Sequence, residues 1–146
     1  MAKTTKTTQR GRKPPKVAKT REIGDTNQEK PLFCFRYADR STTEAWKFDH
    51  EEGQGSRLLH FMCEMCKLTW REVLAQKVGT AKGYLKKHHD QPVDSICKEA
   101  QDDLLRSHVA EDLQADSIFR FRLGGEERLW GFRDGRTFHV VWWDPG

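Results

Sequence analysis

The pattern of hydrophobic and polar positions divides the chain into a polar segment and a patterned segment. Residues 1–30 contain almost no large apolar side chain apart from Val17 and Ile23. A segment of this kind cannot bury enough apolar surface to offset the entropy lost on ordering. The pattern therefore predicts a disordered tail over residues 1–30 and a single folded domain over residues 31–146.

The first half of the folded domain shows strand patterns followed by helix patterns. LFCFRY (32–37) and EAWKF (44–48) are rich in aromatic residues and flank a polar turn, which predicts a two-stranded hairpin. RLLHFMCEMCK (57–67) places its apolar residues and both cysteines on one helical stripe. Thr69, followed three residues later by Glu72, predicts a capping box at the start of a second helix.

The segment that follows is less regular. Residues 78–91 contain two glycines and no clean period, so we expect a loop there. Pro92 is a favoured first-turn residue, and the apolar stripe that it opens fades near His108. This stripe predicts a third helix.

Three strands are predicted at the C-terminal end, over residues 117–123, 127–133 and 136–143. Asp134-Gly135 joins the last two as a two-residue hairpin turn. The predicted order is therefore ββαααβββ, with strands segregated from helices. This order is typical of an α+β fold in which helices pack on a mostly antiparallel sheet that ends in a three-stranded meander.

Alternation along these strands predicts two different faces. The apolar set, expected to form the core, comprises Phe119, Phe121, Trp130, Phe132, Phe138, Val140 and Trp142. The opposite set comprises Arg120, Arg122, Arg133, His139 and Trp143.

The second face has the chemistry of a surface that could cleave RNA. Arg122 and Arg133 could stabilise a phosphorane, and His139 could move a proton, which makes these three the candidate catalytic residues. Arg120 could bind phosphate, and Trp143 could stack on a base. An ordinary solvent-exposed sheet face without a ligand is the favoured interpretation of this pattern, because arginine stems also cover apolar surface.

Charge is distributed unevenly along the 146 residues. Residues 1–21 carry eight Lys and Arg and no acid, whereas residues 22–146 carry the other 18 against all 22 Asp and Glu, a net charge of −4. No apolar run approaches the roughly 20 residues that span a bilayer. No signal peptide is recognisable, so we expect a cytoplasmic protein without a membrane partner.

The basic tail contains RGRKPPK (10–16), which resembles the AT-hook that lies in the minor groove of AT-rich DNA. Arg10 and Arg12 match its arginine-glycine-arginine core, and Lys13 stands where the motif has proline. Arg10, Arg12 and Lys13 are therefore candidate nucleic-acid contacts. A solvated cationic tail with non-specific phosphate contacts is the alternative.

The four cysteines raise the question of a metal site. Cys63 and Cys66 have CxxC spacing, but both fall on the predicted apolar stripe of a helix, whereas zinc-binding pairs usually sit on a tight turn. We therefore expect reduced thiols, with no metal and no cofactor.

FRFRLGGEERLWGFRDGRTFHVVWWDP (119–145) and the Leu68-Thr69-Trp70 helix start resemble a family of small uncharacterised bacterial proteins associated with phage or mobile elements. This resemblance implies no particular activity. The alternative that it supports is a non-enzymatic binding or accessory protein.

The order of helices followed by an antiparallel meander with cations is also similar to the RelE/ParE toxin superfamily. RelE-type members cleave messenger RNA on the ribosome without metal. The similarity implies a metal-independent endoribonuclease that acts on RNA in preference to DNA, with an antitoxin protein as its partner. The acidic folded part and the additional N-terminal hairpin depart from the pattern of that superfamily.

If the tail supplies most of the nucleic-acid affinity, its removal should weaken binding and flatten its salt dependence. Five phosphate contacts would give a log–log salt slope of roughly −4.5 on duplex DNA. A chain that starts at Glu29 should therefore bind DNA or RNA far more weakly, with a shallower slope. Equal binding of the full-length and shortened chains across a salt series would contradict a role for the tail.

Overall fold

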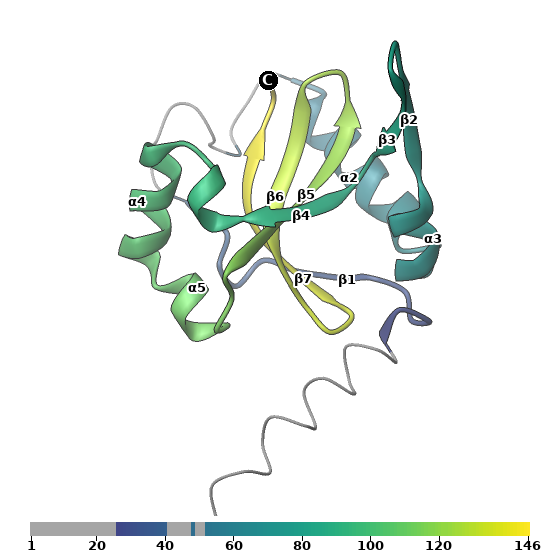
Figure 1. The fold of residues 1–146 in the computed structure, drawn as a ribbon. Helices are drawn as coiled ribbons and strands as arrows, with labels where there is room; N and C mark the ends of the chain where they lie inside the picture. The colour runs from purple at the N-terminus through teal and green to yellow at the C-terminus, as the bar shows by residue number, and fades with distance from the viewer. Residues whose placement is uncertain (1–25, 41–47, 49–51) are drawn as a thin grey trace, which may run out of the picture.

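The computed structural model describes residues 26–40, 48 and 52–146, and in these residues it shows an α+β fold (Figure 1). The five-stranded sheet has the order β1-β7-β6-β5-β4. Its strands are β1 (Leu32–Cys34), β4 (His89–Pro92), β5 (Ser117–Gly124), β6 (Glu127–Asp134) and β7 (Thr137–Asp144). All pairings in this sheet are antiparallel except that of β1 with β7. The predicted fold class and the C-terminal meander are confirmed.

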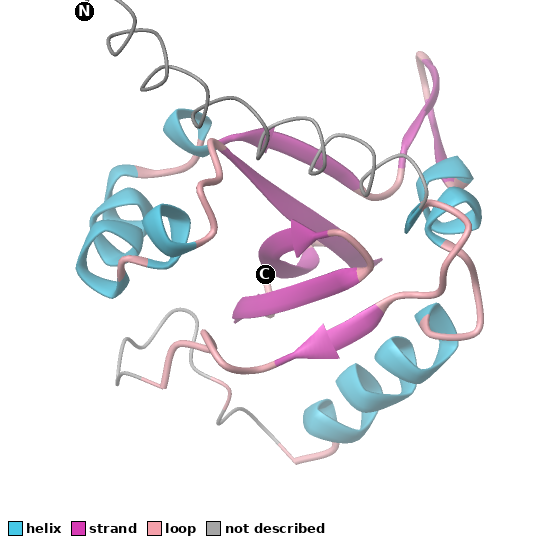
Figure 2. Ribbon diagram, turned by 90° about the horizontal axis from the view of Figure 1, so that it is seen from below, coloured by secondary structure: helices cyan, strands magenta, loops and turns pink. Residues whose placement is uncertain are grey.

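Helices lie on both sides of the sheet (Figure 2). One side carries α2 (Gln54–Met65) and α3 (Trp70–Ala75), and the other carries the short 3-10 turn η2 (Val93–Ser95), α4 (Lys98–Ser107) and α5 (Val109–Asp112). We call these sides the α2–α3 face and the α4–α5 face. The predicted capping box is present at the start of α3, where Thr69 accepts from the Glu72 amide and Glu72 accepts from the Thr69 amide.

Two predicted segments have a different structure. Leu32–Cys34 pairs in parallel with β7, and residues 44–47 of its expected hairpin partner lie outside the described residues. The expected loop at 78–91 instead forms a hairpin of β2 (Lys77–Thr80) and β3 (Gly83–Lys86), and then β4. Almost all side chains of the hairpin are exposed, so no apolar alternation marks it in the sequence.

The third helix starts later than predicted. Pro92 ends β4, and α4 begins at Lys98. The hydroxyl of Ser95 donates to the carbonyl oxygen of Pro92, which closes the turn between the two elements. Proline at the end of an edge strand satisfies the same φ preference as proline in the first turn of a helix, so the sequence alone does not separate these two positions.

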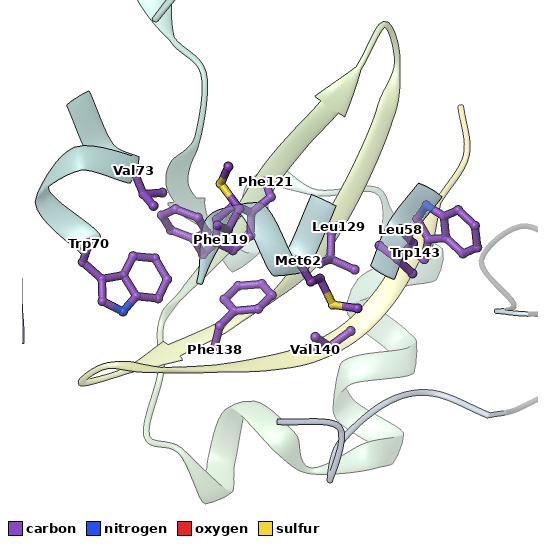
Figure 3. Packing of buried hydrophobic residues seen from close by; sticks show 11 residues of the cluster. Leu58, Met62, Trp70, Val73, Phe119, Phe121, Leu129, Phe138, Val140 and Trp143 are labelled. Atoms are coloured by element: carbon purple, nitrogen blue, oxygen red, sulfur yellow. The ribbon is translucent and has the colours of Figure 1, made fainter. Parts of the chain in front are cut away.

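Both faces of the sheet are buried, in contrast to the predicted single core face. The core on the α2–α3 face contains Leu58, Met62, Met65, Trp70, Val73, Phe119, Phe121, Leu129, Phe138, Val140 and Trp143 (Figure 3). The core on the α4–α5 face contains Ala100, Leu104, Val109, Ile118, Phe132, Val141 and Trp142. Trp130 packs against this second core, so Trp130, Phe132 and Trp142 do not share a face with Phe119 as predicted.

A β-bulge explains the change of face along β7. Trp130 stands opposite Trp142, but its neighbour Gly131 stands opposite Val140, which leaves Val141 as the additional residue. Phe138 and Val140 therefore point to the α2–α3 face, whereas Trp142 points to the α4–α5 face. Simple alternation fails at this point of the strand.

Residues 26–30 contact the folded domain, although the sequence pattern places them in the tail. The carbonyl oxygens of Asn27 and Glu29 accept from the amides of Arg71 and Trp70, at the start of α3. The side chain of Asn27 accepts from Arg133. A chain that starts at Glu29 would lack the Asn27 contacts. A chain that starts at Thr26 keeps these contacts and removes only the residues before them. None of the described helices combines the length and hydropathy needed to cross a membrane.

Gly131 lies opposite the bulge, where no side chain fits. A Cβ atom there would overlap the carbonyl oxygen of His139 and contact the ring of Phe138. Gly131→Ala should therefore lower the free energy of unfolding by about 2–3 kcal/mol, because the paired strands must shift. Gly124→Ala is the matched control, since a Cβ atom there meets nothing within 4 Å. Urea unfolding of both variants tests this prediction, and equal stabilities would contradict it.

Candidate nucleic-acid interface

The structure brings together two of the arginines predicted to share a sheet face. Arg120 and Arg122 both point to the α4–α5 face, in register with Trp130 and Arg128 of β6. Arg128 therefore joins them as a third cation. The sequence pattern did not indicate it, because alternation placed Arg128 with Trp130, which was assigned to the core. All three side chains are half-buried, and together we call them the arginine cluster.

The environment of the arginine cluster is positive. Burial lowers the pKa of Arg120, and the nearby charge of Arg122 adds to this effect. Burial also lowers the pKa of Arg128, and the charges of Arg120 and Arg122 add smaller contributions. The carboxylates of Asp144 and Glu126 act in the opposite direction. Among the described residues, no carboxylate lies within ion-pair distance of these guanidinium groups. Arg128 donates to the carbonyl oxygens of Gly125 and Glu127, at 2.8 and 2.9 Å.

Arg133 is separated from the cluster, in contrast to the prediction. Its guanidinium carbon lies 4.3 Å from the centre of the Trp70 ring, on the α2–α3 face. Its Nε donates to the carbonyl oxygen of Gly135 at 2.8 Å, and its Nη2 donates to Asn27. These contacts tie α3 and the start of the described chain to the β6–β7 turn, which is a structural role.

His139 points to the α4–α5 face but lies one row of side chains away from Arg120. It stands opposite Phe132, whereas Arg120 is in the row of Trp130 and Trp142. Its ring centre is 5.4 Å from that of Tyr37, and burial lowers its pKa. Its buried Nδ1 has no hydrogen-bond partner among the described residues. With Arg133 on the other face, the predicted set of His139, Arg122 and Arg133 does not form one site.

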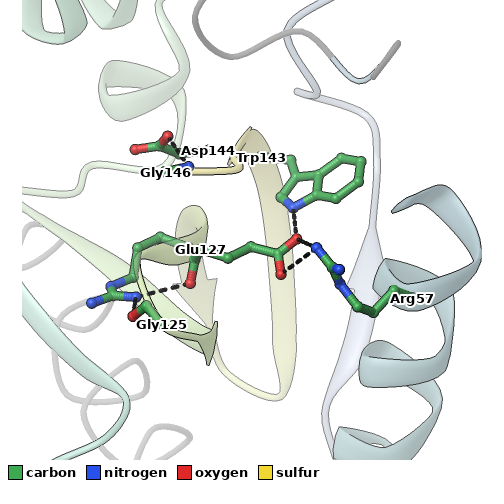
Figure 4. Close-up of polar contacts among 7 residues, drawn as sticks. Arg57, Gly125, Glu127, Trp143, Asp144 and Gly146 are labelled. Carbon is green, nitrogen blue, oxygen red and sulfur yellow. Dashed lines mark hydrogen bonds and ion pairs between the residues drawn. The ribbon is translucent and has the colours of Figure 1, made fainter. Parts of the chain in front are cut away.

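Trp143 does not provide the predicted stacking platform. Only 1% of its surface is exposed, and it belongs to the core on the α2–α3 face. Its indole N–H donates to the buried carboxylate of Glu127 at 3.0 Å, and Arg57 of α2 donates to both oxygens of the same carboxylate (Figure 4). The bulge turns Trp143 to this face, so the predicted assignment is wrong.

Two histidines from the segment that was expected to form a loop border the cluster. His89 stands opposite Arg120, with its Nε2 2.6 Å from an Arg120 nitrogen. His88 is fully buried against the rings of Phe61 and Phe121. Its Nδ1 accepts from the Arg122 amide, so the proton of the neutral ring is on Nε2, which donates to Gln76. His88 therefore fixes the backbone of the arginine cluster.

The remaining predicted candidates lie away from the arginine cluster or outside the described residues. Arg10, Arg12 and Lys13 lie outside the described residues. Cys63 is exposed on α2 rather than buried in its apolar stripe, and Cys66 is half-buried at the end of α2. In the part of the chain that the structure describes, no group of three or more His, Cys, Asp or Glu side chains is arranged to hold a metal ion.

Comparison with protein-family models, with curated protein sequences and with solved structures finds no match to this chain. Its function is therefore inferred from the geometry of the arginine cluster and of its surroundings.

The buried His88 should make stability depend on pH. Burial, and to a smaller extent the positive charges of Lys87 and Arg120, lower the pKa of His88 from 6.5 to about 3. Below about pH 6.5, His88 becomes protonated in the unfolded chain but stays neutral in the folded chain. The free energy of unfolding should therefore fall as the pH falls from 6.5 towards 3. The loss should approach about 1.4 kcal/mol per pH unit.

Urea unfolding between pH 7 and pH 5 checks this dependence. His88→Gln should show a shallower decrease in stability than the wild type, because glutamine has no group that becomes protonated on unfolding. His60→Gln, which changes an exposed histidine of α2, is the matched control and should keep the wild-type slope. Parallel curves for the wild type and His88→Gln would contradict the assignment.

Proposed function

We propose that this protein binds single-stranded RNA in the cytoplasm, without cleaving it, through Arg120, Arg122 and Arg128 on the α4–α5 face. The observation that carries this proposal is the clustering of three half-buried guanidinium groups, none of which forms an ion pair with a described carboxylate. Like charges held together weaken a fold, and an anionic ligand relieves this repulsion. Arginine forks match the geometry of phosphate oxygens.

An aromatic neighbour favours a single strand over a duplex. Trp130 is half-buried and stands directly opposite Arg120 on the same face. A sheet that presents cations beside an aromatic ring suits unstacked bases, whose flat faces are accessible only outside a duplex. Sequence-specific recognition of RNA mostly uses such single-stranded regions.

A basic hairpin adjoins the arginine cluster and supports the same function. Residues 77–87, which form β2, β3 and the residue after them, contain Lys77, Lys82, Lys86 and Lys87 and no acid. Lys77 and Lys86 stand opposite each other, a destabilising arrangement for like charges without a bound anion. The hairpin leads directly into His88, whose ring contacts the Arg122 amide. Positive charge therefore continues from the cluster along the hairpin.

Binding is favoured over cleavage because the candidate catalytic groups are dispersed. A RelE-like reaction at this surface would need Arg122, Arg133 and His139 around one phosphate. Arg133 lies on the opposite face, stacked on Trp70, and His139 lies beside Tyr37. An antitoxin that covers an active site is accordingly not part of this proposal.

Neutralising the arginine cluster should weaken RNA binding and make it less dependent on salt. The variant Arg120→Gln/Arg122→Gln/Arg128→Gln should bind a labelled single-stranded RNA far more weakly. Its log–log salt slope should be shallower by about 2, because each phosphate that is no longer neutralised reduces the slope by roughly 0.7. Fluorescence anisotropy across a salt series measures both quantities, and gel analysis should show intact RNA.

A control variant separates a local effect from one of net charge. Arg40→Gln/Arg71→Gln/Arg136→Gln removes the same charge from the segment after β1, from α3 and from the β6–β7 turn. It should keep most of the wild-type affinity. Equal losses in the two triple variants would argue against a defined interface, and RNA cleavage that His139→Ala abolishes would favour the toxin function instead.

A further inference from the structure

A cavity of about 300 Å³ opens beside the arginine cluster, between the sheet and the segment that leads into α4. Trp130 and Trp142 line it from the sheet, and Ile96, Cys97 and Ala100 line it from the other side. Its polar lining comes from Gln91, Ser95 and Asp144. Its size is at the lower end of small-molecule sites, which are mostly apolar with a few placed polar groups.

Strand register places this cavity directly next to the arginine cluster. One row of side chains across the sheet runs His89, Arg120, Trp130, Trp142. The next row runs Arg122, Arg128, Asp144. The aromatic lining and the carboxylate of the cavity are thus the cross-strand neighbours of Arg120 and Arg128. Phosphates at the cluster would hold the base of the same nucleotide at the mouth of the cavity.

The polar groups of the cavity offer several hydrogen-bond acceptors. Nε2 of Gln91 donates to Ser95, and the hydroxyl of Ser95 donates to the carbonyl oxygen of Pro92. The side-chain oxygen of Gln91 remains to accept, and its second N–H remains to donate. Oδ1 of Asp144 accepts from the Gly146 amide at 3.0 Å, and an ionised carboxylate offers further acceptor positions.

We infer that this cavity takes one unstacked base of the bound RNA, and that it prefers guanine. Guanine carries two adjacent donors, N1–H and the N2 amino group, which a carboxylate can accept together. Uracil offers a single N–H donor flanked by carbonyl oxygens, which Asp144 would repel. The ring would lie against Trp130, at the edge of the second core. This inference rests on the proposed RNA binding and adds to it the identity of one base.

Four RNA heptamers test the inference with the full chain. Each is a uridine heptamer whose central position holds guanosine, inosine, uridine or an abasic ribose. The guanosine heptamer should bind about 10-fold more tightly than the abasic one, from stacking and hydrogen bonds of a single base. Inosine lacks the N2 amino group and should lie between them. Competition against one labelled heptamer at fixed salt ranks all four.

Asp144→Asn is the informative variant, because it keeps the shape of the side chain. It should remove the preference for guanosine over inosine while the contribution of the arginine cluster remains. Asp102→Asn, on the exposed side of α4, is the matched control and should preserve the ranking. Trp130→Leu should lower the affinity for guanosine towards that for the abasic heptamer, with thermal unfolding as a check of folding.

The outcomes separate this inference from the proposed function. Equal affinity for the guanosine and abasic heptamers, with binding still sensitive to the arginine cluster, would overturn the base site and leave RNA binding intact. Equal affinity for guanosine, inosine and uridine, all above the abasic heptamer, would overturn the guanine preference. Absence of binding to every heptamer would overturn both proposals.

Discussion

The β-bulge between β6 and β7 is the feature on which the rest of the structure depends. Without the additional residue Val141, the side chains of β7 would alternate strictly, and Trp142 and Trp143 would exchange faces. The bulge therefore decides which of the two tryptophans enters which core. It requires Gly131 opposite it, because the backbone of β7 approaches too closely for any side chain. One glycine thus permits this bulge.

Burial of both faces decides which charged side chains remain available to a ligand. On the α2–α3 face, Arg133 is stacked on Trp70, and Glu127 is bonded to Arg57 and Trp143. On the α4–α5 face, the second core occupies the end of the sheet near Ile118 and Phe132. The arginine cluster lies in the rows beyond it, next to the cavity. His88 then holds this part of β5 through the Arg122 amide.

Local sequence signals were sufficient to predict those elements whose hydrogen bonds form between residues close together in the chain. The capping box of α3 and the Asp134-Gly135 turn involve neighbouring residues only, and both are present. Alternation also predicted that Arg120 and Arg122 share a face, since β5 is regular at that point. The β2–β3 hairpin was missed, because a ribbon without buried side chains leaves no hydrophobic period to detect.

The sequence by itself therefore determined the α+β class, the meander and the pairing of two arginines on one face. Only the tertiary structure decided that Arg128 lies beside Arg120 and Arg122, and that Arg133 and Trp143 lie on the opposite face. It also decided that a cavity lies next to the arginine cluster. The physical reason is that alternation fixes the relative direction of neighbours within a strand. It does not fix the register between strands, the position of a bulge, or whether helices cover one face of a sheet or both.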